Sequence, residues 1–154
     1  MANVLDLDLI WDNIVTWLGT ITWSDYIGSS HGTMASIRGP SFGEDRLPHV
    51  ATDLVFPARQ ITERAGGSKS VLMWESVFLI RIAVRGDSDQ HADGLALDAW
   101  KGLQQAHKGS GVYMDMARTE IDHSVIEEAA WELGKRDNTV SVIDCTLRVY
   151  RRTT

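Results

Sequence analysis

Residues 72–85 read Leu-Met-Trp-Glu-Ser-Val-Phe-Leu-Ile-Arg-Ile-Ala-Val-Arg. Apolar side chains recur at every second position of this stretch, a period that predicts a β-strand with one buried face. The other face is half polar and is expected to meet solvent or another subunit. The residues expected on the core face are Leu72, Trp74, Ser76, Phe78, Ile80, Ile82 and Val84.

The flanking sequence extends this strand into a sheet. Residues 50–62 are rich in β-formers, and Ala-Gly-Gly-Ser at 65–68 supplies a turn, so the sequence predicts a hairpin over 49–85. Residues 139–151 predict a further strand whose apolar face includes Cys145. Residues 112–121 are expected to be extended, whereas 124–133 fits either a helix or a strand.

Two amphipathic helices are predicted, over about residues 4–22 and 89–107. Asp87, with Gln90 three residues later, is the expected N-cap of the second helix. The stripe of the first helix carries Trp11 and Trp17. These tryptophans either pack within their own domain or meet a neighbouring subunit, because Trp is enriched at interfaces.

The segment 28–46 is expected to be a flexible loop or exposed arm. It contains four glycines and a proline and has no hydrophobic period. An arm that orders only on a partner would explain why it retains Met34, Ile37 and Phe42. The predicted fold is therefore α+β: a single domain over 1–154, with a mostly antiparallel sheet of about four strands, two main helices and a long loop after the first helix.

Composition restricts the class of protein. The chain has 154 residues, of which 44% are hydrophobic and 23% are charged, and its formal net charge is −6. An acidic balance disfavours a protein that coats nucleic acid, and the single cysteine excludes an internal disulfide. No apolar run reaches the length of a membrane span, and the acidic start is not that of a signal peptide. These features predict a domain that assembles in the cytoplasm without membrane contact.

Three motifs suggest chemistry, and each has a simpler interpretation. Residues 28–32, Gly-Ser-Ser-His-Gly, match a nucleophile elbow, but they lie between a helix and a loop. Residues 66–70, Gly-Gly-Ser-Lys-Ser, have a serine where a phosphate-binding loop needs glycine and precede a strand. The acids of 87–93 lack the glycine and glutamate of a calcium loop. The sequence predicts no catalytic residue, no metal and no cofactor.

Taken together, the pattern resembles the tail terminator (tail completion) proteins of long-tailed bacteriophages. The resemblance covers nearly the whole chain. It rests on the N-terminal helix, residues 47–50 (Leu-Pro-His-Val), the strand ending at 78–85, the helix 92–107 and the closing strand 145–152, Cys-Thr-Leu-Arg-Val-Tyr-Arg-Arg. The loop at 28–46 is longer than the family pattern leads us to expect.

The resemblance implies a structural protein of the virion, located at the head-proximal end of the tail, and not an enzyme. Such proteins form a ring, expected to be a hexamer, that caps the tail tube, stops its polymerisation and offers a surface to a head-completion or neck protein. DNA would pass through the lumen without specific binding. The residues predicted to join subunits or partners are Trp11, Trp17, Arg81, Arg85, Glu127, Glu128, Asp144, Arg148, Arg151 and Arg152.

Two alternatives remain open at this stage. The first is a head–tail connector or other neck protein, which would have a similar size and topology. The second is a small hydrolase that uses the 28–32 loop, or a metal-binding domain that uses the acids of 87–93.

Overall fold

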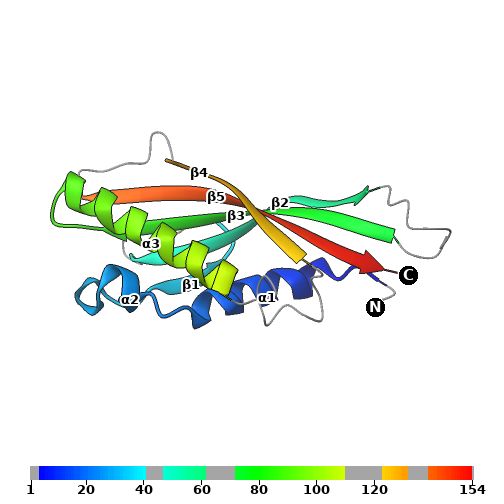
Figure 1. Cartoon of the computed structure of the whole chain (residues 1–154), viewed down its shortest axis with the longest axis horizontal. Helices are drawn as coiled ribbons and strands as arrows, with labels where there is room; N and C mark the ends of the chain where they lie inside the picture. Colours follow the sequence, from blue (N-terminus) through cyan, green and yellow to red (C-terminus); the bar gives the residue numbers. More distant parts are fainter. Residues whose placement is uncertain (1–3, 41–46, 62–71, 110–122, 132–138, 154) are drawn as a thin grey trace.

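A computed structural model describes residues 4–40, 47–61, 72–109, 123–131 and 139–153 (Figure 1). Three helices and five strands are found in these ranges, together with a short 3₁₀ helix. In chain order the elements are α1 (Leu7–Thr20), α2 (Ser24–Ile27), the 3₁₀ helix η1 (Ser29–His31), β1 (Ala35–Arg38), β2 (His49–Ile61), β3 (Leu72–Arg85), α3 (Asp89–Gly109), β4 (His123–Trp131) and β5 (Val140–Thr153).

The described strands form one mixed sheet in the order β1-β2-β3-β5-β4. β1 runs parallel to β2, and the other neighbouring pairs are antiparallel. The prediction of about four mostly antiparallel strands with two helices was therefore wrong. It failed because β1 and α2 have only four residues each. Elements this short show no hydrophobic period, and both lie close to or within a segment rich in glycine and serine.

The part of 28–46 that the structure describes is folded and does not form an arm. Met34 is buried, and β1 is anchored on both sides. The Ala35 amide donates to the Pro48 carbonyl (3.1 Å) on one side, and the Ser36 hydroxyl donates to the Val15 carbonyl of α1 (2.6 Å) on the other. Residues 41–46, with Phe42, lie outside the described residues.

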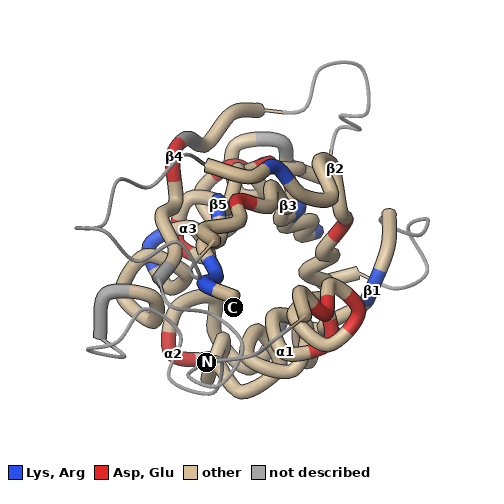
Figure 2. Tube along the Cα trace, turned by 90° about the vertical axis from the view of Figure 1, so that its right-hand side faces the viewer, with Lys and Arg blue, Asp and Glu red and all other residues tan. Residues whose placement is uncertain are grey.

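All described helices lie on one side of the sheet (Figure 1). Viewed along the long axis, the sheet arches over the layer formed by α1 and α3 (Figure 2). The core fills the space between these two layers. The largest of its fully buried side chains are Phe78, Ile10, Ile14, Leu18, Ile80, Ile82, Leu103 and Leu147.

The predicted hairpin strands are present, and the predicted core face of β3 is confirmed from Ser76 to Val84. At the start of the strand the prediction was wrong: Leu72 and Trp74 are only partly buried, whereas Glu75 on the opposite face is buried because arginines of β2 and β5 contact it. β2 and β3 pair over their length, and Phe78, Ile80 and Ile82 of the core face are almost fully buried. The ambiguous segment 124–133 forms β4 over most of its length. The hairpin turn at 65–68 and the extended segment predicted at 112–121 lie outside the described residues.

Both predicted helices are present, but one cap differs. Asp6 caps α1, because its carboxylate accepts from the Leu9 amide at 3.1 Å. At α3 the cap is Ser88, because its hydroxyl accepts a hydrogen bond from the His91 backbone amide at 3.2 Å. Asp87, the predicted cap, is instead linked through its own amide to His91 Nδ1 at 2.9 Å.

Candidate functional sites

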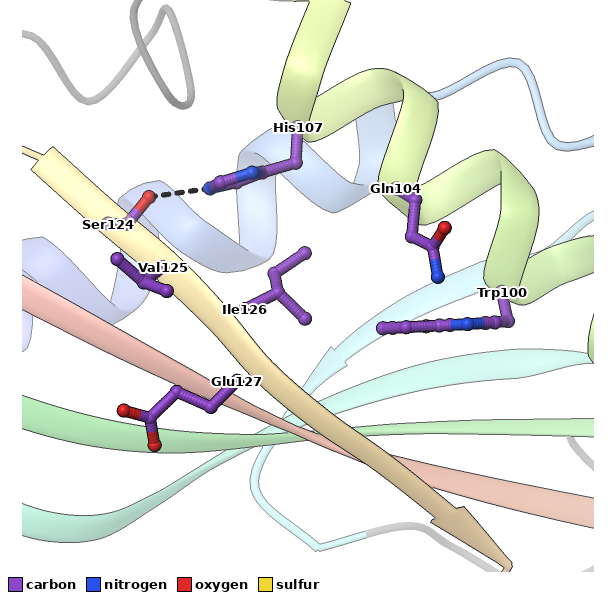
Figure 3. Close-up of a pocket in the computed structure, with 7 residues that line it drawn as sticks. All are labelled: Trp100, Gln104, His107, Ser124, Val125, Ile126 and Glu127. Carbon is purple, nitrogen blue, oxygen red and sulfur yellow. Dashed lines mark hydrogen bonds between the residues drawn. The ribbon is translucent and has the colours of Figure 1, made fainter.

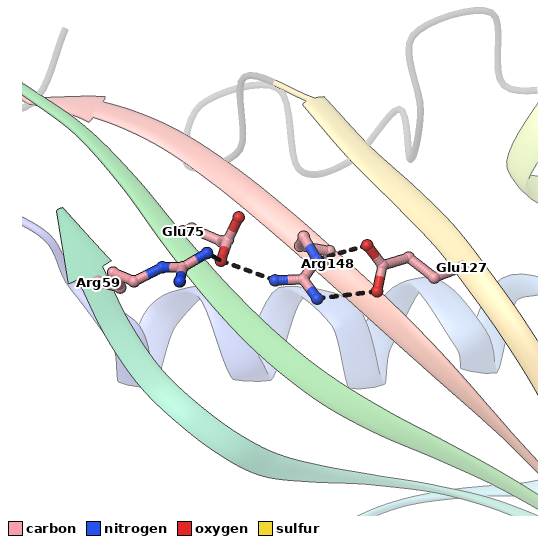
Figure 4. Close-up of polar contacts among 4 residues, drawn as sticks. All are labelled: Arg59, Glu75, Glu127 and Arg148. Atoms are coloured by element: carbon pink, nitrogen blue, oxygen red, sulfur yellow. Dashed lines mark hydrogen bonds and ion pairs between the residues drawn. The ribbon is translucent and has the colours of Figure 1, made fainter. Parts of the chain in front are cut away.

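Four charged side chains cross the sheet face that lies opposite the helices (Figure 4). Each comes from a different strand, and together we call them the charge ladder: Arg59 of β2, Glu75 of β3, Arg148 of β5 and Glu127 of β4. Glu75 Oε1 accepts from Arg59 at 2.6 Å and from Arg148 at 2.7 Å. Arg148 also donates two hydrogen bonds to the Glu127 carboxylate, at 2.6 and 2.9 Å. The signs of the four charges therefore alternate across the sheet.

Burial within the charge ladder is greatest at Glu75. Its side chain is only 6% exposed, compared with 24% for Arg148 and 60% for Arg59. The hydrogen bonds from Arg148 lower the pKa of Glu127, and the same contacts raise the pKa of Arg148. The ladder thus places a nearly buried carboxylate between two guanidinium groups.

A hollow of about 300 Å³ lies on the charge ladder. Its walls combine Arg59, Glu75 and Arg148 with two apolar side chains, Phe56 and Val77. Phe56 is 46% exposed although it is a large aromatic residue. This face therefore presents both buried charge and exposed apolar surface.

Four of the charged residues predicted to join subunits or partners form two ion pairs within the chain. Arg81 and Asp144 are partners in the β3–β5 register and make two hydrogen bonds, at 2.8 and 3.1 Å. The second such pair is Arg148 with Glu127. These four charges therefore have a folding role that the sequence did not reveal, whether or not they also meet a partner.

The structure separates the remaining basic candidates. Arg85 and Arg152 are exposed on β3 and β5. Arg151 is 7% exposed and lies on the strand face that also carries Val149 and the core. Glu128 belongs to β4 and is paired with Thr146 of β5 in the sheet register.

Both tryptophans of α1 pack inside the chain. Trp17 is 5% exposed and meets the His107 ring edge-on, with centroids 6.3 Å apart. Trp11 donates its indole N–H to the Thr52 carbonyl at 2.9 Å, and the Arg38 guanidinium lies 4.1 Å from its ring centre. Of the two alternatives for these tryptophans, the structure therefore favours packing within their own domain. This packing leaves the two side chains little surface for a partner.

A second pocket, of about 300 Å³, lies between α3 and β4 (Figure 3). Trp100, Gln104 and His107 line it from α3, where their spacing places them on one face of the helix. At one end, His107 Nε2 is 2.8 Å from the Ser124 hydroxyl of β4. Burial lowers the pKa of His107, so the ring is neutral near pH 7. This pocket could not be predicted from the sequence, because α3 and β4 are brought together only by the fold.

The three suspected chemical motifs gain no support. Residues 28–32 consist of η1 with a glycine on either side, and they follow α2 directly, so they do not form the strand-to-helix turn that a nucleophile elbow requires. No cluster of three metal-ligating side chains occurs among the described residues. Burial raises the pKa of Cys145 to about 12, so its thiol is inert. None of the helices in the described ranges is long and apolar enough to cross a membrane.

Comparison with known proteins gives a likeness to an enzyme. No family model matches the chain. The adenylate kinase of Rhodococcus erythropolis is 27% identical over 139 residues, which cover 80% of this chain and 75% of that protein. Identity at this level is a likeness and does not place the chain in a family.

This likeness corrects two expectations. The sequence was expected to encode a structural protein that caps the phage tail tube, and to have no enzymatic activity. The similar protein is an enzyme, which contradicts both expectations. The resemblance to tail terminator proteins, a virion location, a six-membered ring, and tail-tube and neck partners remain untested predictions.

Proposed function

We propose that this chain functions as a homo-oligomer whose subunits meet on the sheet face that carries the charge ladder. The observation that carries the proposal is the ladder itself, with the almost buried Glu75 between Arg59 and Arg148. The proposal concerns the assembled unit, and it applies to an enzyme as well as to a structural protein.

The order of charges in the ladder favours a second copy as the partner. From β2 to β4 the signs are plus, minus, plus, minus. Consider a second copy placed on this face by a 180° rotation about an axis that runs along the strands, midway along the ladder. The signs of its ladder run in the opposite order, so each arginine faces a glutamate of the other copy. A two-fold interface requires this kind of self-complementary surface.

Apolar surface supplies the affinity that exposed ion pairs lack. Exposed pairs contribute about 0–1 kcal/mol each, so the charges would mainly select the partner and the register. Phe56 lies beside the ladder and has the exposed aromatic area from which interface anchors are drawn. Burying it against a second copy would also remove water from the ladder.

The test compares two substitutions at equally exposed apolar residues. Phe56→Asp places a charge on the ladder face, whereas Leu97→Asp places one on α3, on the opposite side of the sheet. The two side chains are 46% and 45% exposed, so the fold should tolerate both changes equally well. Circular dichroism checks the fold, and light scattering during size-exclusion chromatography gives the mass.

We expect the wild type and Leu97→Asp to be oligomers and Phe56→Asp to be a monomer with an unchanged spectrum. A wild-type monomer at every accessible concentration would refute the proposal. So would a Phe56→Asp variant that retains the wild-type mass.

A second candidate function is phosphoryl transfer between adenine nucleotides, and the Rhodococcus likeness supports it. The stretch 66–70 that is closest to a phosphate-binding loop lies outside the described residues, and it joins the antiparallel strands β2 and β3. A phosphate-binding loop opens a helix, so this setting does not supply the usual cradle. Incubating the protein with ATP, AMP and Mg²⁺ and measuring ADP tests this candidate directly; no ADP above a buffer blank would reject it.

A further inference from the structure

The pocket between α3 and β4 has one flat aromatic wall and an amide beside it. Figure 3 shows the Trp100 ring edge-on, with the Gln104 side chain extending from α3 next to it and Ile126 of β4 between the two elements. The other apolar lining residue is Val125. At about 300 Å³, the pocket is at the small end of the range for sites that hold small molecules.

The polar groups of this pocket are arranged for a neutral ligand. Within the described structure, neither the Gln104 amide nor the Trp100 indole N–H makes a hydrogen bond. The Gln104 amide can donate and accept at once, which suits the paired donor and acceptor on the edge of a heteroaromatic ring. Glu127 is the only carboxylate among the described lining residues, and it points away from the pocket toward Arg148 (Figures 3 and 4).

We infer that this pocket binds a planar heteroaromatic ring of the nucleobase type, stacked on Trp100 and held along one edge by Gln104. Stacking on an aromatic side chain contributes about 1–3 kcal/mol per base. Among the lining residues that the structure describes there is no lysine or arginine, and from these a phosphate group on the ligand would gain no ion pair. The site should therefore prefer a nucleoside to the corresponding nucleotide.

Adenosine is the probe, and isothermal titration calorimetry on the full chain is the measurement. We expect adenosine to bind at least as tightly as AMP. Trp100→Ala should weaken binding by roughly 5- to 150-fold, the range that corresponds to the lost stacking. Gln104→Leu should weaken it by roughly 2- to 13-fold, which corresponds to one net hydrogen bond. Because Gln104 is exposed on α3, its substitution should leave the fold intact.

Trp131→Ala is the matched control. Trp131 is an exposed tryptophan on β4, the strand that forms the other wall of the pocket. It is not one of the lining residues, so adenosine binding should be unchanged in this variant. Three results would overturn the inference: no adenosine binding at millimolar concentration, equal affinity in Gln104→Leu and wild type, or much tighter binding of AMP than of adenosine. The inference is independent of self-association, because the Phe56→Asp monomer should bind adenosine like the wild type.

Discussion

Replacing Arg148 with methionine tests the energetics of the charge ladder. Methionine retains an unbranched apolar stem and removes one hydrogen bond to Glu75 and two to Glu127. The Glu75 carboxylate, 6% exposed, would then keep Tyr150 and Arg59 as partners, and the Arg59 side chain is 60% exposed. Breaking a fully buried ion pair costs about 3–5 kcal/mol. Because Arg59 remains and Arg148 is itself partly exposed, we expect a loss of about 2–3 kcal/mol.

Urea unfolding followed by circular dichroism measures this loss, with all variants at the same protein concentration because association adds stability. Arg38→Met is the matched control. Arg38 also bridges two carboxylates, but Asp8 and Asp12 are 75% and 55% exposed, so its loss should be clearly smaller.

A double-mutant cycle identifies the cause of the loss. In a Glu75→Gln background no buried charge remains, so Arg148→Met should then cost less than about 1 kcal/mol. Equal losses for Arg148→Met and Arg38→Met, or an undiminished loss in the Glu75→Gln background, would refute the reasoning that burial of Glu75 makes the ladder strong.

Three further predictions concern the helical side of the molecule. Gly94→Ala should stabilise the protein by about 0.5–1 kcal/mol, because nothing lies within 4 Å of the added methyl group. Gly102→Ala on the same helix should destabilise it by about 1–3 kcal/mol, because that methyl group would lie 2.5 Å from the Tyr26 ring; urea unfolding of both variants checks the two signs. Cys145, with its pKa raised to about 12 by burial, should not react with a thiol reagent until the protein unfolds, and prompt modification of the native protein would contradict the core assignment. Burial lowers the pKa of His107 below 6.5, so the folded state binds fewer protons than the unfolded chain, and stability should fall as pH drops below about 6.5. His107→Gln should lose this part of the pH dependence, and an unchanged profile would show that His107 does not cause it.

The sequence predicted those elements whose burial repeats along the chain. The alternation in β3 identified its core face over the second half of the strand, and the stripes of α1 and α3 identified both long helices. The sequence could not predict β1, because a four-residue strand has no measurable period and ten residues separate it from its partner, β2. The parallel pairing depends on contacts with α1 that no local pattern records.

The candidate sites were harder to predict than the fold. Glu75 looked like a solvent-facing residue of a half-polar strand, yet it is among the most buried charges because arginines 16 and 73 residues away meet on it. Arg81 and Arg148 were predicted to join subunits, and the structure shows that each has a partner within the same chain. Only the strand order, with β5 between β3 and β4, brings these charges together. Reversing Arg81 would therefore disturb the fold before it could report on an interface.

A chemical cross-link between two copies would test the proposed two-fold assembly most directly. Val77 lies opposite Arg148 in the β3–β5 register, near the centre of the charge ladder. A two-fold axis through that centre would place the two copies of residue 77 about 10 Å apart, the spacing of sheets packed face to face, which is too far for a disulfide but suits a thiol-specific bifunctional cross-linker of that span. Treated with such a cross-linker, Val77→Cys should give a covalent dimer, whereas Leu97→Cys, on the opposite side of the sheet, should remain monomeric on a denaturing gel. No cross-linked dimer of Val77→Cys, or equal cross-linking of the two variants, would contradict the account.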